Sequence, residues 1–409
     1  MSFAESARTR HASARDAARP QVTRFLGVDA LDRARQVGAE WDERLRADLP
    51  ADLDIFDAHT HLGTDIDRMV GRYEELIGLM EAYGISQAFM FCLDEPDRHP
   101  GFRAGNDRTL EFAARADGRL IPFVRLALDE GPIEEARRCL DLGARGIKLH
   151  PRAQKFLLND ERLAPVFALA AERGVPILIH AGRGLPPIAA GLERLVDANP
   201  GAQLILAHAG IADLANLAHR FSGKRGVFFD TSVWSAIDLL GLLRLVPPEQ
   251  IVYASDFPYG GQPGSLLLSL RVARAAGFDE RQLREMFAGN ARRMAAGQEP
   301  AEPSQPQGSD VLEQPLAQAR IHQYLSMAMP LLFVRQPDAF GALGLALNAT
   351  EEPNGTHREL LGQIRELLEA ARDLWRTLPE AEDDSERRVL ARTAVRLIQI
   401  ADTVAVTTR

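Results

Sequence analysis

The feature that most constrains the fold is a regular alternation of short apolar runs with amphipathic helical stretches between residues 54 and 256. Each run is almost continuously apolar, which is typical of a strand buried on both faces of a parallel sheet. Eight such runs occur, at Asp54–His59, Ser86–Cys92, Arg119–Leu126, Ala144–His150, Val175–His180, Ala202–His208, Gly226–Ser232 and Gln250–Asp256. Strands that alternate with helices in this way predict an α/β fold with a parallel sheet.

The helical stretches and their spacing narrow the architecture further. Helical periods occur at Tyr73–Tyr83, Ile133–Leu142, Arg162–Arg173, Ile188–Ala198 and Leu266–Ala276. Glycine, a common helix stop signal, follows four of these stretches. Strand ends recur about every 28 residues, which favours a (β/α)8 TIM barrel. The alternative is a doubly wound open sheet, but no glycine-rich phosphate loop follows the first run.

Composition divides the chain into four parts. Residues 1–50 are predicted to form an N-terminal arm with one helix at 29–48, preceded by a loosely attached segment at 1–22. The barrel is expected over 51–297, with a last helix near 280–296. Residues 298–314 are rich in Pro, Glu, Gln and Ser and are interpreted as a linker. Residues 315–409 are predicted to be a helical domain, with periods at 317–333, 357–378 and 385–404, and no chemical motif indicates its role.

Charge and cysteine content exclude several function classes. The net charge of −9 argues against a nucleic-acid partner or an anionic membrane surface, both of which require a basic face. No apolar run is long enough to span a membrane. Two cysteines, Cys92 and Cys139, are too few for a disulfide scaffold or a thiolate zinc cluster. We therefore expect a cytoplasmic protein whose partner is a small-molecule substrate.

Histidine and aspartate residues occur where the predicted strands end, which is where barrel enzymes place their catalytic groups. His59 and His61 close the first run, His180 closes the fifth and Asp256 closes the eighth. Residues two apart on a strand share a face, so Asp57, His59 and His61 are all expected to point into the barrel mouth. Three imidazoles and a carboxylate suit one divalent ion, most simply Zn2+, with Mn2+ or Fe2+ as alternatives. Asp256 is also a candidate general base.

Two more polar residues at strand ends have open roles. His208 is expected either to polarise a carbonyl or hold the nucleophilic water, or to orient ligands by donating to a carboxylate. Lys148 lies inside a predicted strand, where a lone charge is too costly, so it must be paired, neutral or modified. Three explanations remain open. Lys148 could form a carbamate that bridges two metals, pair with a substrate carboxylate, or pair with Asp57 or Asp256.

Residues near the remaining strand ends are weaker candidates. His150 shares a face with Lys148, and the loop after it could present Arg152 to an anionic substrate, as could Arg183 later in the chain. Either arginine could equally be an ordinary surface residue. Trp234, Phe257, Tyr259 and Asp230 either line the pocket or pack against it, and Cys92 is interpreted as a small apolar filler.

These motifs resemble the amidohydrolase superfamily, in its amidohydrolase-related branch, also called amidohydrolase family 2. The resemblance covers residues 54–294 and rests on five motifs in order: D-A-H-T-H-L-G at 57–63, G-I-K-L-H-P at 146–151, I-L-I-H-A-G at 177–182, L-A-H-A-G at 206–210 and A-S-D-F-P-Y-G at 254–260. The segment F-A-G-N-A-R-R-M at 287–294 is similar to the last-helix signature of that family.

The resemblance implies a (β/α)8 barrel with a mononuclear divalent site. It implies His59, His61, His180 and Asp256 as metal ligands, with His208 close to the reacting group. Lys148 occupies the position that is carboxylated in other branches, but a mononuclear site is commoner in this branch, so the bridging role is not carried over. The N-terminal arm and helical tail have no counterpart in the family pattern and could shift the oligomeric state, so a homo-oligomer is left open.

Three functions are compatible with these observations. The first is a metal-dependent hydrolase that cleaves an ester, lactone or amide bond of a small molecule. The second is a non-oxidative decarboxylase of an aromatic or unsaturated acid, similar to aminocarboxymuconate-semialdehyde decarboxylase, with Arg152 or Arg183 near the carboxylate. The third is a barrel kept as a binding or scaffold module, which missing ligands would support. All four expected ligands are present, so the first function is favoured.

Overall fold

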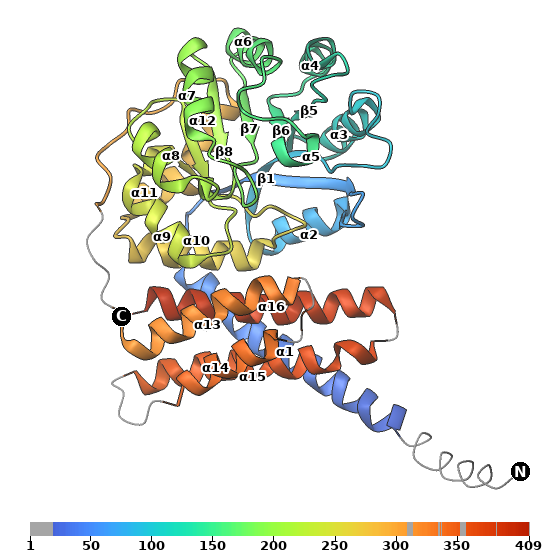
Figure 1. The fold of residues 1–409 in the computed structure, drawn as a ribbon, viewed down its shortest axis with the longest axis vertical. Coiled ribbons are helices and arrows are strands. Elements are labelled where there is room, and N and C mark those ends of the chain that lie inside the picture. Colours follow the sequence, from blue (N-terminus) through green and yellow to red (C-terminus); the bar gives the residue numbers. More distant parts are fainter. Residues whose placement is uncertain are drawn as a thin grey trace, which may run out of the picture. The chain divides into compact units, whose positions relative to one another are not determined.

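The computed structural model describes residues 19–308, 314–333, 336, 338–351, 357–381 and 383–408. Contacts within the chain define two units (Figure 1). One unit contains the residues from Leu45 to Glu313, and the other contains the residues before Leu45 together with those from Gln314 onward. The sequence pattern predicts the N-terminal arm and the C-terminal helices as separate parts, whereas the structure groups most of the arm with those helices. The first 18 residues of the expected arm lie outside the described residues.

The larger unit contains a strand within every run that the sequence analysis predicts. The strands are β1 (Ile55–Thr64), β3 (Ile85–Cys92), β4 (Leu120–Pro122), β5 (Val124–Arg125), β6 (Ile147–Leu149), β7 (Pro176–Ile179), β8 (Gln203–Leu206), β9 (Val227–Asp230) and β10 (Ile251–Val252). The third predicted run corresponds to both β4 and β5, which Phe123 separates. A further strand, β2 (Val70–Gly71), pairs antiparallel with the end of β1 and has no counterpart among the predicted runs.

The described pairings of the other strands are all parallel. One sheet has the order β2-β1-β3-β4 and the other has the order β10-β9-β8-β7-β6-β5. Phe123 alone connects β4 of the first sheet to β5 of the second. Thr60 in β1 also forms an isolated parallel bridge with Phe257, in the segment after β10. The strands therefore form an α/β fold with parallel sheets, in which β1 is also bridged to the segment after β10.

Helices follow most of the strands, as the alternating pattern predicts. They are α2 (Tyr73–Ala82), α3 (Arg103–Arg115), α4 (Pro132–Asp141), α5 (Pro151–Gln154), α6 (Leu163–Arg173), α7 (Ala189–Ala198), α8 (Leu214–Phe221), α9 (Ala236–Leu245) and α10 (Gln262–Ala275). The last predicted helix consists of α11 (Glu280–Arg284), a π-helical segment at 285–289 and α12 (Asn290–Ala295). Gly174 ends α6 with a φ of +60°, a conformation that glycine adopts without steric cost.

One apolar cluster combines side chains from the strands with others from the end of this unit. It contains Phe56, Ala58, Phe89, Phe91, Phe123, Leu178, Ile205, Ala207, Phe228, Val252, Ala254, Ala288, Ala291 and Met294. These side chains come from strands that are far apart in the sequence, so burying them stabilises the arrangement of the whole sheet. The carboxyl ends of the same strands carry the polar residues discussed below.

The smaller unit contains α13 (Leu316–Phe333), α14 (Ala339–Ala349), α15 (Arg358–Thr377), α16 (Asp384–Thr407) and the part of α1 (Arg19–Asp48) that precedes Leu45. Helix α1 begins ten residues before the predicted start at residue 29. Helix α14 is missing from the prediction because its sequence, AFGALGLALNA, is apolar on all sides and lacks an amphipathic period. None of the described helices combines the length and the apolar character that a membrane-spanning helix needs.

The alternation of side chains breaks inside β1. Asp57 pairs with Ala88 and Thr60 pairs with Met90, so three residue steps in β1 match two in β3. This bulge changes which side chains face the apolar cluster. Ala58 belongs to that cluster, and the ring of the next residue, His59, lies 5.3 Å from the ring of Phe91 in the same cluster.

The bulge overturns the expectation for Asp57. Its carboxylate accepts hydrogen bonds from Ser255 N, at 2.9 Å, and Ser255 Oγ, at 2.6 Å. It also accepts a hydrogen bond from Gln262 of α10. The prediction that Asp57 points into the mouth with His59 and His61 is therefore wrong. Asp57 instead fixes the loop that follows β10.

Asn290 connects the last helix of this unit to the start of β10. Its Nδ2 donates to the carbonyl oxygen of Pro248 at 2.9 Å and to that of Ile251 at 2.8 Å. The side chain is 1% exposed, so no water replaces these bonds when they are lost.

We predict that Asn290→Ala lowers the free energy of unfolding by about 1–3 kcal/mol, because two buried carbonyl groups lose their donor. Urea denaturation followed by circular dichroism measures this change. The control is Asn216→Ala on α8, where the exposed amide donates to Asp213. The control is expected to change stability by less than about 0.5 kcal/mol. Equal effects of the two substitutions would contradict this role for Asn290.

Candidate active site

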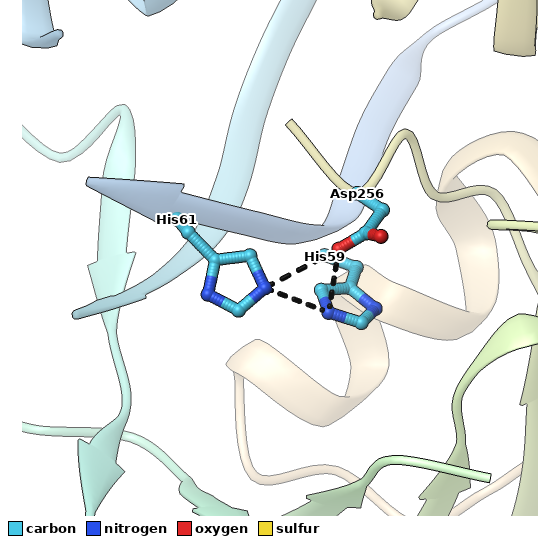
Figure 2. A group of neighbouring side chains, drawn as sticks. All are labelled: His59, His61 and Asp256. Atoms are coloured by element: carbon cyan, nitrogen blue, oxygen red, sulfur yellow. Dashed lines mark hydrogen bonds and ion pairs between the residues drawn. The ribbon is translucent and has the colours of Figure 1, made fainter. Parts of the chain in front are cut away.

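Two histidines of β1 and the aspartate that follows β10 converge in the larger unit (Figure 2). His59 Nε2 lies 3.2 Å from His61 Nε2, and each of these atoms lies 3.3 Å from Asp256 Oδ1. All three residues are buried. Within the described part of the chain, these residues form the group of His, Cys, Asp or Glu side chains that could share a metal ion.

Backbone pairing brings Asp256 to the two histidines. Asp256 N donates to the carbonyl oxygen of His59 at 2.9 Å, and His61 N donates to that of Phe257 at 2.7 Å. Asp256 has a φ of +56°, in the left-handed region that is unfavourable for residues other than glycine. His208 and Ala209, after β8, have the same φ of +57°. Each such residue costs roughly 1–2 kcal/mol, and strain of this kind clusters at functional sites.

Asp230, at the end of β9, fixes the orientation of His59. Its Oδ2 lies 2.7 Å from His59 Nδ1, and its Oδ1 accepts hydrogen bonds from His208 N and from the amide and hydroxyl groups of Ser232. Because a carboxylate accepts, His59 Nδ1 carries the proton and Nε2 keeps a lone pair that faces His61. The sequence alone leaves the role of Asp230 ambiguous, although its place at a strand end matches that of the other site residues.

His180 and His208 are held by a second chain of hydrogen bonds. His208 Nδ1 lies 2.9 Å from the carbonyl oxygen of Ser232, so this nitrogen is the donor. His208 Nε2 lies 2.9 Å from His180 Nδ1, and in a neutral His208 it accepts the His180 proton. His180 Nε2 then keeps a lone pair, and this buried atom has no hydrogen-bond partner in the described part of the chain.

The structure thus brings three of the four predicted ligands together, and His180 lies outside that close group. The ring of His180 stacks on that of His150, with centroids 3.9 Å apart. His150 also accepts a hydrogen bond from Ala153 N at the start of α5.

Burial keeps the histidines neutral. It lowers the pKa of His61 to about 3, and it lowers the pKa values of His59, His150 and His180 well below the usual range. Neutral imidazole is the form that binds metal. The Nε2 atoms of His59 and His61, together with the carboxylate of Asp256, therefore fit a divalent cation.

Lys148 of β6 lies beside the same group. Its Nζ is 3.2 Å from His59 Nε2 and 4.7 Å from the centroid of the Phe91 ring. Burial is the main cause that lowers the pKa of Lys148 to about 7. Asp57 faces Ser255 and α10 instead. The charge of Asp256 acts on Lys148 and offsets part of the lowering of its pKa.

The weaker candidates from the sequence differ in how far their side chains are buried. Arg152 is exposed, and the side chain of Arg183 is 69% exposed and lies 3.8 Å from Asp238. Trp234 is half-buried between β9 and α9. The hydroxyl of Tyr259 donates to Asp65 Oδ2 at 2.6 Å, and its ring lies edge-on to His61.

Cys92 and Arg125, which lie at the ends of β3 and β5, are both buried. Cys92 is a free thiol in an apolar cluster with Phe102 and Ala127, which confirms its interpretation as a filler. Arg125, at the end of β5, is 2% exposed and is not among the site residues predicted from the sequence. Its position two residues after Phe123, inside an apolar run, is the signal that could have identified it.

Comparisons with known proteins give one family match. A family model described as Amidohydrolase matches residues 56–294. No curated protein matches the chain. Solved structures that resemble it include an uncharacterized TIM-barrel protein from Bordetella bronchiseptica, at 15% identity over 60% of this chain and 99% of that chain, with a TM-score of 0.46.

Two further solved structures show a similar degree of likeness. IDCase from Metarhizium anisopliae, in apo form, is 16% identical over 61% of this chain and 99% of its own, with a TM-score of 0.45. A 4-oxalomesaconate hydratase from Rhodopseudomonas palustris is 17% identical over 59% of this chain and 96% of its own, with a TM-score of 0.45.

The segment that matches the family model makes up more than half of the chain and contains His59, His61, His180 and Asp256. The chain therefore belongs to the amidohydrolase family and is an enzyme of the amidohydrolase type.

Proposed function

We propose that this protein is a metal-dependent hydrolase that uses an activated water molecule to cleave an ester, lactone or amide bond of a small molecule. The observation that carries the proposal is the buried convergence of His59 Nε2, His61 Nε2 and Asp256 Oδ1. We also infer that the strands close into a (β/α)8 barrel, supported by the Thr60–Phe257 bridge and the single residue between β4 and β5. The site then lies at the carboxyl ends of the strands, where such enzymes place their chemistry.

His59, His61, His180 and Asp256 are the residues that would hold the metal. Their nitrogen and oxygen atoms suit Zn2+ best and also accept Mn2+ or Fe2+. When bound, a divalent ion supplies Lewis-acid chemistry, lowering the pKa of water and polarising a carbonyl group.

Asp256 serves as both ligand and general base. Its Oδ1 contacts the two histidines of β1, whereas Oδ2 lies 4.0 Å from His208 Nδ1. The carboxylate can take a proton from the attacking water and return it to the leaving group. Its backbone bond to His59 holds it in place during both transfers.

His208 is assigned a positioning role. Both of its ring nitrogens are engaged, Nδ1 with Ser232 and Nε2 with His180. This favours the orienting role over direct contact with a substrate carbonyl. Asp230 supports the role, because the same carboxylate bonds to His59 Nδ1 and to the backbone of His208.

We predict that Asp256→Asn lowers kcat by about 10²–10⁴-fold, because an amide cannot accept the proton. The assay is release of acid from a panel of aryl esters, lactones and anilides, and circular dichroism verifies the fold. Asp238→Asn, a partly exposed change on α9, is the control and is expected to keep the normal rate. A near-normal rate for Asp256→Asn would contradict the proposal, and release of CO2 without hydrolysis would favour decarboxylation instead.

Purified protein is expected to contain about one divalent ion per chain, since the donor set forms a single site. His61→Ala should lose most of this metal, whereas His219→Ala, at an exposed position on α8, should retain it. Elemental analysis measures the content. Protein that contains no divalent ion and gains no activity with added Zn2+ or Mn2+ would refute the metal-dependent mechanism.

We predict that Asp230→Asn weakens metal affinity about 10–100-fold, because His59 loses the acceptor that fixes its Nδ1 proton. Metal competition with a chromophoric chelator measures the affinity. Asp213→Asn is the matched control, because this carboxylate accepts from the backbone of Ile188 and Ala189 at the start of α7. It should alter thermal stability but not metal affinity, and equal metal affinities for the two variants would exclude a positioning role for Asp230.

A further inference from the structure

His61 differs from the other site histidines in how its ring is held. His59 Nδ1 faces the carboxylate of Asp230. His208 Nδ1 donates to the carbonyl oxygen of Ser232. His61 Nδ1, in contrast, is buried and has no hydrogen-bond partner among the residues that the structure describes. A ligating histidine is usually oriented by a hydrogen bond from its second nitrogen, so another kind of contact must orient the ring of His61.

Two aromatic rings lie almost perpendicular to the imidazole of His61. The centroid of the Phe91 ring is 4.4 Å from that of His61, with an angle of 80° between the planes. The centroid of the Tyr259 ring is 5.8 Å away, with an angle of 87°. Perpendicular contacts at these distances are a favoured geometry for aromatic pairs. Because His61 is only 4% exposed, packing against these rings restricts how far its imidazole can turn.

The backbone brings both rings to His61. In the parallel pairing of β1 with β3, His61 is the partner of Phe91, and the side chains of paired residues lie on the same face. Tyr259 lies in a turn after β10, in which Gly260 N donates to the carbonyl oxygen of Asp256 at 2.9 Å. One turn therefore carries both the carboxylate of Asp256 and the ring that packs on His61.

Tyr259 is anchored at its hydroxyl end. The hydroxyl group donates to Asp65 Oδ2 at 2.6 Å. Asp65 is buried and also accepts hydrogen bonds from the backbone amides of Asp67, at 3.1 Å, and Asp94, at 3.3 Å. These bonds tie Tyr259 to the loops that follow β1 and β3. Contacts within the protein thus hold the ring in place, as preorganisation of a functional site requires.

We propose that Tyr259 and Phe91 are positioning residues that orient His61 Nε2 toward the metal. The inference rests on the proposed function, because it concerns how the same site holds its metal. Phe91 also lies 5.3 Å from His59 between ring centroids and belongs to the apolar cluster, so removing it would disturb more than His61. Tyr259 lies outside that cluster and packs on His61, so it is the residue to change.

The test measures the affinity of the full, chelator-treated chain for Zn2+ and Co2+ by competition with a chromophoric chelator. Tyr259→Leu removes the ring and is expected to weaken the affinity about tenfold, as loss of a group that orients a metal ligand does. Tyr259→Phe keeps the ring and should weaken it by less than about threefold, because only the hydrogen bond to Asp65 is lost. The visible absorption of bound Co2+ should change in Tyr259→Leu and be preserved in Tyr259→Phe.

Two controls separate positioning from stability, and circular dichroism verifies the fold of each variant. Tyr73→Leu on α2 removes a tyrosine ring that stacks on Phe112, and it should leave the affinity and the Co2+ spectrum unchanged. In a chain that already carries His61→Ala, Tyr259→Leu should change the affinity by less than about twofold, because its effect passes through His61.

The proposal is overturned if Tyr259→Leu binds metal as tightly as the wild type, or if Tyr259→Phe or Tyr73→Leu is equally impaired. A tenfold loss that persists in the His61→Ala background also overturns it. A wild-type chain that binds no divalent ion contradicts the proposed function as well. A normal wild-type affinity with an unaffected Tyr259→Leu contradicts this inference alone.

Discussion

The site depends on backbone pairing between the first strand and the segment after the last one. The bonds from Asp256 N to His59 O and from His61 N to Phe257 O join residues almost 200 positions apart. These two backbone hydrogen bonds bring the carboxylate of Asp256 close to the imidazoles of His59 and His61. These hydrogen bonds flank an isolated parallel bridge between Thr60 and Phe257, so the geometry of the site is maintained by backbone hydrogen bonds. This arrangement places functional side chains on rigid elements.

Burial then determines the chemical state of these side chains. Removing the imidazoles from water disfavours their charged form, so they remain neutral and keep lone pairs available for a cation. A neutral imidazole has two possible tautomers, and the protein selects one. Asp230 selects it at His59, and the carbonyl group of Ser232 selects it at His208 and, through that ring, at His180. Orientation and electronic state are therefore set by residues that are not themselves predicted ligands.

The two basic side chains on β5 and β6, Arg125 and Lys148, differ in whether they keep their charge. Lys148 and Arg125 lie next to each other on neighbouring strands, both almost completely buried. The lowered pKa of Lys148 allows this amine to lose its proton near neutral pH, whereas a guanidinium stays protonated at any physiological pH. Arg125 is thus a permanent cation on the strand next to Lys148.

The sequence alone determined the features that depend on local pattern. Apolar runs located every strand of the parallel sheet, because strands buried on both faces are recognisable without knowledge of their neighbours. The pairing of His59 with His61 and the place of Asp256 followed from their positions at strand ends. Local pattern did not reveal α14, because a helix that is apolar on all sides has no period to detect.

Only the tertiary structure decided which way several side chains face and what they contact. The bulge in β1 turned Asp57 toward the loop after β10, because one extra residue reverses the alternation that sequence reasoning assumes. The contacts of Asp230, Ser232 and Arg125 depend on atoms contributed by other elements of the chain. Their significance is a property of distance and burial across the sheet, which no local stretch of sequence encodes.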